Sequence, residues 1–412
     1  MRRDVRSSYK FVTLAALILG ALAVFARAQA PHPVVILVSI DGFRADYFNR
    51  ADVPALRAIA GAGVRAEALL PSFPTQTFPN HWTIVTGLTP DHHGIVSNTI
   101  VDRSIGPTRF TMTSATGKDP RWWGGEPVWA TAMRQGRRAA TMFWPGSEAV
   151  HPTYWKPFDG AMPNADRVRQ VLDWLALPEA ERPSFITLYF SDVDTASHNF
   201  GPESSQTFAA AKHLDEMISR LMTGIGRSQV KGVTSVVVVS DHGLAATSAG
   251  RQVILDDYVS PDEVEVIDAG AWLALNPAGT ATVDGVYQKL VGKHPSLTIY
   301  KKDALPPELR YGSHARVPAI VGLVPPGWTV TSRARSVSDW ADGRLQRGSH
   351  GYDSRASEMR ALFAATGPRI RRGFVLPPLE NIHLYAFMCE LLGIKPAAND
   401  GDAARTAAAI VR

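Results

Sequence analysis

The 412-residue chain contains one cysteine, Cys389. A single cysteine cannot form an internal disulfide, so stability must come from an apolar core or from bound metal ions. With 45% hydrophobic and 20% charged residues, the composition is that of a globular protein large enough to build such a core. The residues around Cys389 are apolar at helical spacing, which predicts a buried helix position without chemistry.

Long apolar runs are also scarce, and the main one lies within the first thirty residues. Residues 1–10 are basic, residues 11–25 are apolar, and Ala26-Arg27-Ala28 has the small-residue pattern of a cleavage site. The apolar run is shorter than the roughly 20 residues of a membrane-spanning helix. We therefore expect a signal peptide over residues 1–28 and an exported protein, periplasmic or secreted, with no membrane span after cleavage. A membrane anchor is the alternative.

An excess of positive charge is missing once this segment is set aside. Residues 1–28 hold five Lys or Arg and one Asp, so the formal net charge falls from +5 to +1 without them. A protein that binds nucleic-acid duplexes by a basic surface is therefore not expected.

Four short apolar runs that end at polar residues or glycine are predicted strands. They span residues 33–43, 185–194, 235–243 and 359–368, and runs of this kind are typical of strands buried on both faces of a parallel sheet. Patterns between them predict helices over residues 53–63, 165–177 and 206–225. The alternation predicts an α/β fold with a doubly wound, mostly parallel sheet covered by helices on both faces.

Residues 252–347 interrupt this alternation with frequent proline and glycine and with short, irregular strand patterns. We expect a small α+β insertion or cap there, and a core formed by residues 29–251 and 348–395. The segment 396–412 is rich in small residues and is expected to be a flexible tail.

Potential metal ligands gather where predicted strands end. Ligands of open α/β sheets bind beyond the carboxyl ends of the strands, and mixed carboxylate and imidazole sets favour zinc over calcium or magnesium. Asp194 and His198 are four residues apart, so a helical turn would place them on one face. Six such ligands suffice for two three-ligand sites, as a two-metal hydrolytic site requires. The set comprises Asp41, Asp194, His198, Asp241, His242 and His350.

Each of these motifs has a simpler explanation when taken alone. Asp41-Gly42 is a common turn dipeptide, and a histidine four residues after an aspartate is often only a surface pair. Their joint occurrence at successive strand ends favours metal binding. A metal-binding protein without catalytic activity is also compatible with these residues.

The stretch PSFPTQTFPNHWTIVTG, residues 71–87, contains no lysine, arginine, aspartate or glutamate. Thr75, Thr77 and Thr83 lie there within nine residues, and Thr77 directly precedes Phe78-Pro79. Turn chemistry explains such threonines, and so does a nucleophile at a helix start, where anions are favoured. A threonine hydroxyl needs a base or a metal to attack. The chain has no Gly-x-Ser-x-Gly motif, which excludes the usual serine-esterase elbow.

Six stretches carry a resemblance to a known family. They are the strand ending at Asp41-Gly42-Phe43, FPTQTFPNHWTIVTGLTPDHHGI, WWGGEPVW, DTASHNFGP, SDHG and GSHGYD. With them, and with Asn98 lying 21 residues after Thr77, the chain resembles the nucleotide pyrophosphatase/phosphodiesterase family of the alkaline phosphatase superfamily over nearly its whole length after residue 28. The resemblance implies an alkaline-phosphatase-like fold. One departure is Asp192-Val193-Asp194, where many members of the family have Glu-Pro-Asp.

The resemblance also implies two Zn²⁺ ions per chain. One would be held by Asp194, His198 and His350. The other would be held by Asp41, Asp241 and His242, with Thr77 Oγ completing its ligand shell.

The remaining site residues follow from the same resemblance. Thr77 would be the nucleophile and form a phosphothreonine, while Asn98 and the Phe78 backbone N–H would donate hydrogen bonds to a phosphoryl oxygen. Phe78 and Tyr189 resemble the aromatic pair that sandwiches a nucleobase in members that cleave nucleotides.

The activity implied is that of an exported phosphodiesterase or nucleotide pyrophosphatase that takes a small phosphodiester or nucleotide and releases nucleoside 5′-monophosphates. Neutral groups such as Gln76 surround Thr77 in the sequence, which favours a singly charged diester or pyrophosphate centre over a monoester. Residues 72–76 lack the arginine of a sulfatase motif. Glycerophosphodiesters, lysophospholipids or phosphonates are alternative substrates, since Phe78 and Tyr189 would also enclose a choline ammonium by cation–π contact.

Overall fold

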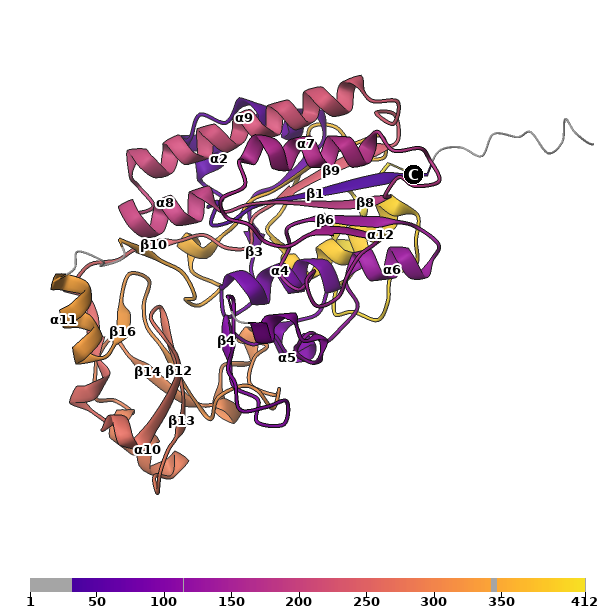
Figure 1. Ribbon diagram of the computed structural model, residues 1–412. Coiled ribbons are helices and arrows are strands. Elements are labelled where there is room, and N and C mark those ends of the chain that lie inside the picture. The colour runs from indigo at the N-terminus through magenta and orange to yellow at the C-terminus, as the bar shows by residue number, and fades with distance from the viewer. Residues whose placement is uncertain (1–31, 114, 342–346, 412) are drawn as a thin grey trace, which may run out of the picture. The chain divides into compact units, whose positions relative to one another are not determined.

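The computed structural model describes residues 32–113, 115–341 and 347–411 (Figure 1). The predicted signal peptide, residues 1–28, lies outside these ranges. No helix in the described ranges has both the length and the apolarity of a membrane span.

The main sheet is built on β1 (Val34–Ile40), which lies parallel to β9 (Thr234–Val239) on one side and to β8 (Phe185–Phe190) on the other. All three strands are buried along their whole length, as expected for apolar strands of a parallel sheet covered on both faces. Eight strands pair in the order β19 (Phe374–Leu376), β2 (Val64–Ala66), β18 (Phe363–Thr366), β9, β1, β8, β6 (Ala139–Met142) and β7 (Tyr154–Lys156).

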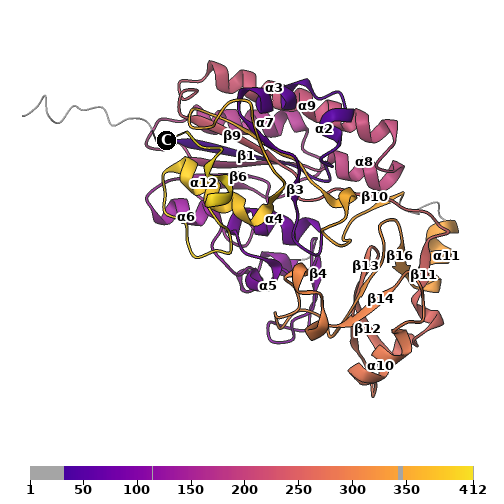
Figure 2. The same cartoon turned by 180° about the vertical axis from the view of Figure 1, so that it is seen from behind.

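Helices cover both faces of this sheet (Figures 1 and 2). Alternate residues of β1 enter two separate apolar clusters, because successive side chains of a strand point to opposite faces. Val35 and Leu37 pack with α4 (Thr77–Thr86), α6 (Val128–Arg134) and α12 (Leu384–Leu392). Ile36 and Val38 pack with α3 (Pro54–Ala62), α7 (Asn164–Leu175) and α9 (Ser205–Arg227).

The doubly wound, mostly parallel sheet expected from the sequence is confirmed. The predicted helices 53–63, 165–177 and 206–225 correspond to α3, α7 and α9, and the predicted strands to β1, β8, β9 and β18. Strand β18 differs from the other three, because it runs antiparallel to both β9 and β2.

Residues 252–347 contain a separate four-stranded antiparallel sheet in the order β12 (Val264–Ala269), β13 (Trp272–Pro277), β15 (Ile320–Leu323) and β14 (Thr298–Lys301). The short strands β11 (Gln252–Ile254) and β16 (Thr329–Thr331) pair in parallel beside it. Helices α10 (Val283–Leu290) and α11 (Arg333–Ala341) complete this part. We keep 252–347 as the proposed bounds of the insertion.

The expectation of a flexible tail over residues 396–412 was wrong for the described part, up to residue 411. Asp400 accepts a hydrogen bond from Thr89 N (2.8 Å) at the start of α5 (Pro90–His93), and Val411 N donates to Arg369 O (2.8 Å). The side chain of Thr406, within α13 (Ala404–Ala407), is fully buried. Small residues therefore pack here against the core instead of fraying.

The remaining helices and strands are short connections. They are α2 (Tyr47–Arg50), α8 (Asp192–Phe200), β3 (Leu69–Leu70), β4 (Thr99–Ile100), β5 (Phe110–Thr111), β10 (Ala245–Ala246), β17 (Gly348–Ser349) and β20 (Leu379–Glu380).

Candidate functional site

The carboxyl ends of the three central parallel strands bring the predicted ligands together. Asp41 follows β1, and its N–H donates to Phe190 O (2.9 Å) at the end of β8. Asp241 and His242 follow β9, and β8 leads into α8, which carries Asp194. Because parallel strands end at one edge of the sheet, residues as far apart in the chain as Asp41 and His242 meet there.

Gly42 allows the closest approach at this edge. Its φ is +70°, and a Cβ at this position would lie 2.8 Å from Asp194 Cα. An L-residue would thus be strained in the backbone and would displace α8. The Asp41-Gly42 turn is therefore also a packing requirement of the site.

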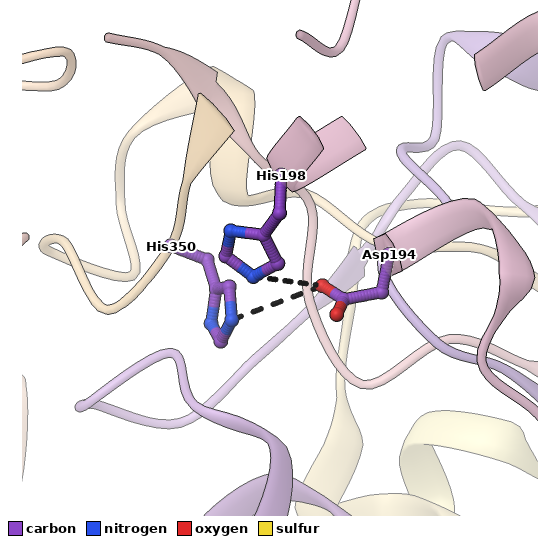
Figure 3. Close-up of side chains that lie close together, drawn as sticks. All are labelled: Asp194, His198 and His350. Carbon is purple, nitrogen blue, oxygen red and sulfur yellow. Dashed lines mark ion pairs between the residues drawn. The ribbon is translucent and has the colours of Figure 1, made fainter. Parts of the chain in front are cut away.

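A first ligand group consists of Asp194, His198 and His350. Asp194 Oδ1 lies 3.3 Å from His198 Nε2 and 3.8 Å from His350 Nε2. Figure 3 shows both imidazole rings directed at this one carboxylate. Asp194 and His198 share a face of α8, as their spacing predicted, and His350 follows β17.

The three residues predicted to hold the second ion, Asp41, Asp241 and His242, lie beside the first group and are called the second ligand group below. Ligand atoms of Asp41 also lie near those of Asp194 with His242, and near those of Asp241 with His81. His242 Nε2 is 3.0 Å from Asp241 Oδ2 and 3.6 Å from Asp41 Oδ1. Its ring stacks on that of His350, with 3.6 Å between the ring centroids. The two groups are therefore adjacent.

Three carboxylate oxygens of these side chains are suited to bind divalent metal ions. Asp41 Oδ1, Asp194 Oδ1 and Asp241 Oδ2 are buried and have no hydrogen-bond donor in the described part of the chain. Buried carboxylate oxygens of this kind are costly unless a cation binds them. In the same described part, histidines are the only ion-pair partners of these three carboxylates.

The orientation of the three predicted histidine ligands also fits metal binding. Nδ1 of His198 bonds to Gly348 O (2.8 Å), that of His350 to Thr75 O (2.9 Å) and that of His242 to Gly243 O (3.2 Å). A carbonyl accepts only a donated proton, so each Nδ1 is protonated and each Nε2 keeps its lone pair. This is the tautomer that a metal-ligating histidine requires.

His81 lies as close to the carboxylates but has the opposite orientation. Its Nδ1 is 3.4 Å from Asp241 Oδ2 and donates to Thr77 O (2.8 Å), while its Nε2 bonds to Ser39 Oγ (2.8 Å). Since the nitrogen facing Asp241 carries a proton, it cannot ligate a metal. We infer that His81 instead holds the Thr77 backbone in place through its hydrogen bond to Thr77 O.

The pKa shifts of several of the predicted ligands agree with a cation site. Burial and the neighbouring Asp241 and Asp194 raise the pKa of Asp41 well above its usual range. Burial also raises the pKa of Asp194, but His198 and His350 outweigh it and leave that pKa below the ordinary value. Burial lowers the pKa of His350 to about 3, so that this ring is neutral. Burial lowers the pKa of His198, but the charge of Asp194 and its contact with the ring outweigh this and leave that pKa above the ordinary value. Clustered carboxylates repel one another until a cation is bound.

Thr77 is the first residue of α4 and its side chain is 8% exposed. Its hydroxyl lies 3.3 Å from His242 Nε2, next to the second ligand group. A helix start also offers N–H groups and a favourable field for an anion. The structure thus places the predicted nucleophile, the ligands and an anion-compatible helix end together.

Asn98 lies at the same helix start, but its contact differs from the expectation. Its Oδ1 accepts a hydrogen bond from Phe78 N (2.9 Å), so this N–H does not point freely at a phosphoryl oxygen. Because Oδ1 is engaged, the Nδ2 amide is the end of Asn98 left to donate.

Comparison with known proteins identifies the family of this chain. Residues 35–353 match the family model described as type I phosphodiesterase/nucleotide pyrophosphatase. The chain belongs to this family. The resemblance inferred from the six sequence motifs is thereby confirmed.

Curated members of the phosphodiesterase family match along most of the chain. A venom phosphodiesterase of Crotalus durissus collilineatus is 35% identical over 380 residues, which cover 89% of this chain and 45% of the venom protein. Ectonucleotide pyrophosphatase/phosphodiesterase family member 1 of Homo sapiens is 32% identical over 383 residues, 90% of this chain and 41% of the human protein. The chain spans about half the length of these relatives.

Solved structures of the family share the fold. Murine ectonucleotide pyrophosphatase/phosphodiesterase 5 superposes with a TM-score of 0.86 at 29% identity, covering 92% of this chain and 100% of the murine chain. That murine protein is described as an inactive threonine-to-alanine variant in complex with AMP.

Tyr189 does not offer a ring face to a nucleobase, contrary to the expectation from the sequence. It is 9% exposed, and its hydroxyl donates to Asp41 Oδ2 (2.6 Å). This bond leaves Asp41 Oδ1 directed at the second ligand group. Tyr189 therefore positions a ligand, while Phe78 is half-buried against Phe110 and Trp123.

A hydrogen-bond network that sequence reasoning missed connects Asp268, Ser97 and Gln76 and supports the nucleophile helix. Asp268 Oδ2, in β12 of the insertion, accepts hydrogen bonds from Gln76 Nε2 (2.8 Å) and Ser97 Oγ (2.8 Å). Gln76 Oε1 in turn accepts from Asn98 N (3.0 Å). No local motif marks this role of Asp268, because Gln76 and Ser97 lie more than 170 residues earlier.

Tyr189→Phe is expected to weaken binding of a metal ion at this site by about tenfold or more, since loss of a residue that orients a metal ligand typically costs 10–100-fold in affinity. The phenyl ring is retained, so the core stays filled. Zinc titration of the purified protein measures the change. Tyr154→Phe is the matched control, because the Tyr154 hydroxyl donates only to Glu181 O (3.1 Å), away from the site. Equal zinc affinity of Tyr189→Phe and wild type would refute the positioning role.

Proposed function

We propose that the protein is an exported two-zinc phosphodiesterase/nucleotide pyrophosphatase that forms a phosphothreonine and releases nucleoside 5′-monophosphates. The observation that carries this proposal is the Thr77 hydroxyl at a helix start, 3.3 Å from His242 and beside two adjacent sets of carboxylates and histidines. Membership of the phosphodiesterase family supports the reaction class. AMP bound to the murine relative supports a nucleotide as substrate.

Zinc is the proposed metal because the donors are carboxylate oxygens and imidazole nitrogens in groups of three, which leave open positions. Asp194, His198 and His350 would hold one ion, and Asp41, Asp241 and His242 the other. Bound there, zinc would promote deprotonation of a hydroxyl and neutralise charge that develops on the phosphoryl group.

The residues of the chain then carry out two displacements. Thr77 Oγ attacks phosphorus, its proton leaves to solvent, and the bond from phosphorus to the leaving oxygen breaks. Water next attacks the phosphothreonine, which returns the threonine hydroxyl and releases the monophosphate. Asn98 Nδ2 donates to a phosphoryl oxygen. His81 and Gln76 keep Thr77 and Asn98 in position at the helix start.

The nucleoside would contact Phe78, which keeps a partly open ring beside Thr77. With Tyr189 buried, Phe158 is our candidate for a second aromatic surface. It is 57% exposed and lies against Tyr189, with 6.2 Å between the ring centroids. Stacking of bases on such rings is worth about 1–3 kcal/mol per base.

A kinetic comparison of purified protein tests the proposed function. We expect faster hydrolysis of bis(p-nitrophenyl) phosphate than of p-nitrophenyl phosphate, because no lysine or arginine in the described ranges pairs with the carboxylates of the site and the monoester carries an additional negative charge. A chelator should remove both activities. Monoester turnover above diester turnover, or activity that resists chelation, would overturn the proposal.

Asp268→Ala is expected to lower kcat for the diester by about 10- to 100-fold with little change in KM, because small misplacements of a reacting group cost that much. The variant releases Gln76 and Ser97, and with them the register of Asn98. Asp262→Ala is the matched control, since this aspartate is exposed in the same insertion. A rise in KM with unchanged kcat would show that Asp268 binds substrate instead.

Export is the remaining part of the proposal. It rests on the sequence of residues 1–28 and on relatives named as venom and ecto-enzymes. N-terminal sequencing of protein from the natural host should begin at Gln29, and an intact Met1 in the mature protein would contradict cleavage.

A further inference from the structure

A polar cavity of about 440 Å³ opens beside the first ligand group. His198 and His350 form part of its wall, together with Gln76 and Asn98 from the nucleophile side. The rest of the wall comes mainly from the insertion. Besides Gln76 and Asn98, seven lining residues carry hydroxyl or amide groups: Thr99, Thr247, Ser248, Gln252, Thr329, Thr331 and Ser349.

The position of the cavity indicates that it receives the leaving group of the reaction. Thr77 lies beside His242 in the second ligand group, whereas the cavity is bordered by His198 and His350 of the first. In an in-line displacement the leaving oxygen departs opposite the nucleophile. The group beyond that oxygen therefore extends into this cavity, away from Phe78, which does not line it.

The charges of the cavity disfavour a polyphosphate there. Arg335 is the only lysine or arginine among its described lining residues, and Asp339 Oδ2 lies 3.4 Å from its Nε. Asp268 adds a second carboxylate. A leaving pyrophosphate needs cations or bidentate arginines, whereas hydroxyl and amide groups pair with the hydroxyls of an uncharged alcohol.

We propose that this cavity is the leaving-group subsite and that it selects neutral, hydroxyl-rich alcohols, such as a nucleoside leaving through its 3′ oxygen, over pyrophosphate. This inference rests on the proposed function. In the step concerned, the Thr77 Oγ–phosphorus bond forms, the phosphorus–O3′ bond breaks, and the O3′ oxygen takes a proton from water.

The test compares two substrates that release the same AMP, the dinucleoside monophosphate ApA and ATP. Wild type should have the higher kcat/KM for ApA. Thr329→Lys adds a cation to the cavity wall and should raise the ATP-to-ApA ratio of kcat/KM by about fivefold, the scale of a partly screened ion pair. Thr298→Lys is the matched control, because Thr298 is exposed on β14 of the same insertion, outside the cavity; it should leave the ratio unchanged.

Calorimetric binding to Thr77→Ala protein gives a readout without turnover. In that background, Thr329→Lys should strengthen ATP binding by about fivefold and leave AMP binding unchanged, because AMP does not reach the cavity. An ATP preference in wild type, or an equal shift from Thr329→Lys and Thr298→Lys, would overturn the subsite. Failure of wild type and all variants to hydrolyse either substrate would refute the proposed function. In that case the change in ATP binding caused by Thr329→Lys in the Thr77→Ala protein would still test the proposed role of the cavity.

Discussion

Thr77→Ala is expected to lower diester turnover by about 10⁴-fold or more, the scale seen when a nucleophile is removed. The site would lose Thr77 Oγ but keep the six aspartate and histidine ligands and Asn98, so binding of AMP should persist within a few fold. Thermal stability should change little, because the substitution removes one hydroxyl at a helix start that is not part of the apolar core. Steady-state kinetics and calorimetry on one preparation measure both effects.

Two variants show whether this loss is specific to the Thr77 hydroxyl. Thr77→Ser keeps a hydroxyl and should retain measurable turnover. Thr86→Ala removes a buried threonine from the same helix, whose hydroxyl donates to Trp82 O (2.7 Å), and should stay near wild-type activity. Turnover of Thr77→Ala within tenfold of wild type would exclude Thr77 as nucleophile.

Removal of metal is expected to abolish activity and to destabilise the fold. Three buried carboxylates would then lie together without a cation, as the raised pKa of Asp41 indicates. A site saturated at about a thousandfold its Kd contributes about 4 kcal/mol of unfolding free energy. Thermal unfolding with and without chelator measures this change, and added zinc should restore both stability and turnover.

Stoichiometry separates the two ligand groups. Wild type should bind two zinc ions, and His350→Ala, which damages the Asp194 group, should bind one tightly. His213→Ala removes an exposed histidine of α9 and should bind two. Two tight ions in His350→Ala would show that the ligand grouping is wrong.

The sheet and the ligand cluster were predictable because both depend on short-range patterns. Buried β-branched runs such as residues 236–239 have few alternatives to a parallel strand, and parallel strands end at one edge. Asp41, Asp194 and Asp241 therefore had to meet once the strands were recognised. The spacing of Asp194 and His198 fixed their common helix face.

Other parts of the site depend on contacts that no local pattern encodes. Tyr189 ends a buried strand, and only the structure shows its hydroxyl on Asp41 instead of a free ring face. Asp268 reaches Gln76 from an insertion whose strands are irregular in sequence. The segment after residue 395 has a composition typical of a flexible terminus, yet Asp400 accepts a hydrogen bond from Thr89 N at the start of α5.

The stereochemical course at phosphorus tests the central claim most directly. Hydrolysis of a chiral phosphorothioate diester in isotopically labelled water distinguishes one displacement from two. Attack by Thr77 followed by attack of water on the phosphothreonine inverts phosphorus twice, so the account predicts net retention. Net inversion would show that water attacks the substrate directly and would contradict a nucleophilic role of Thr77.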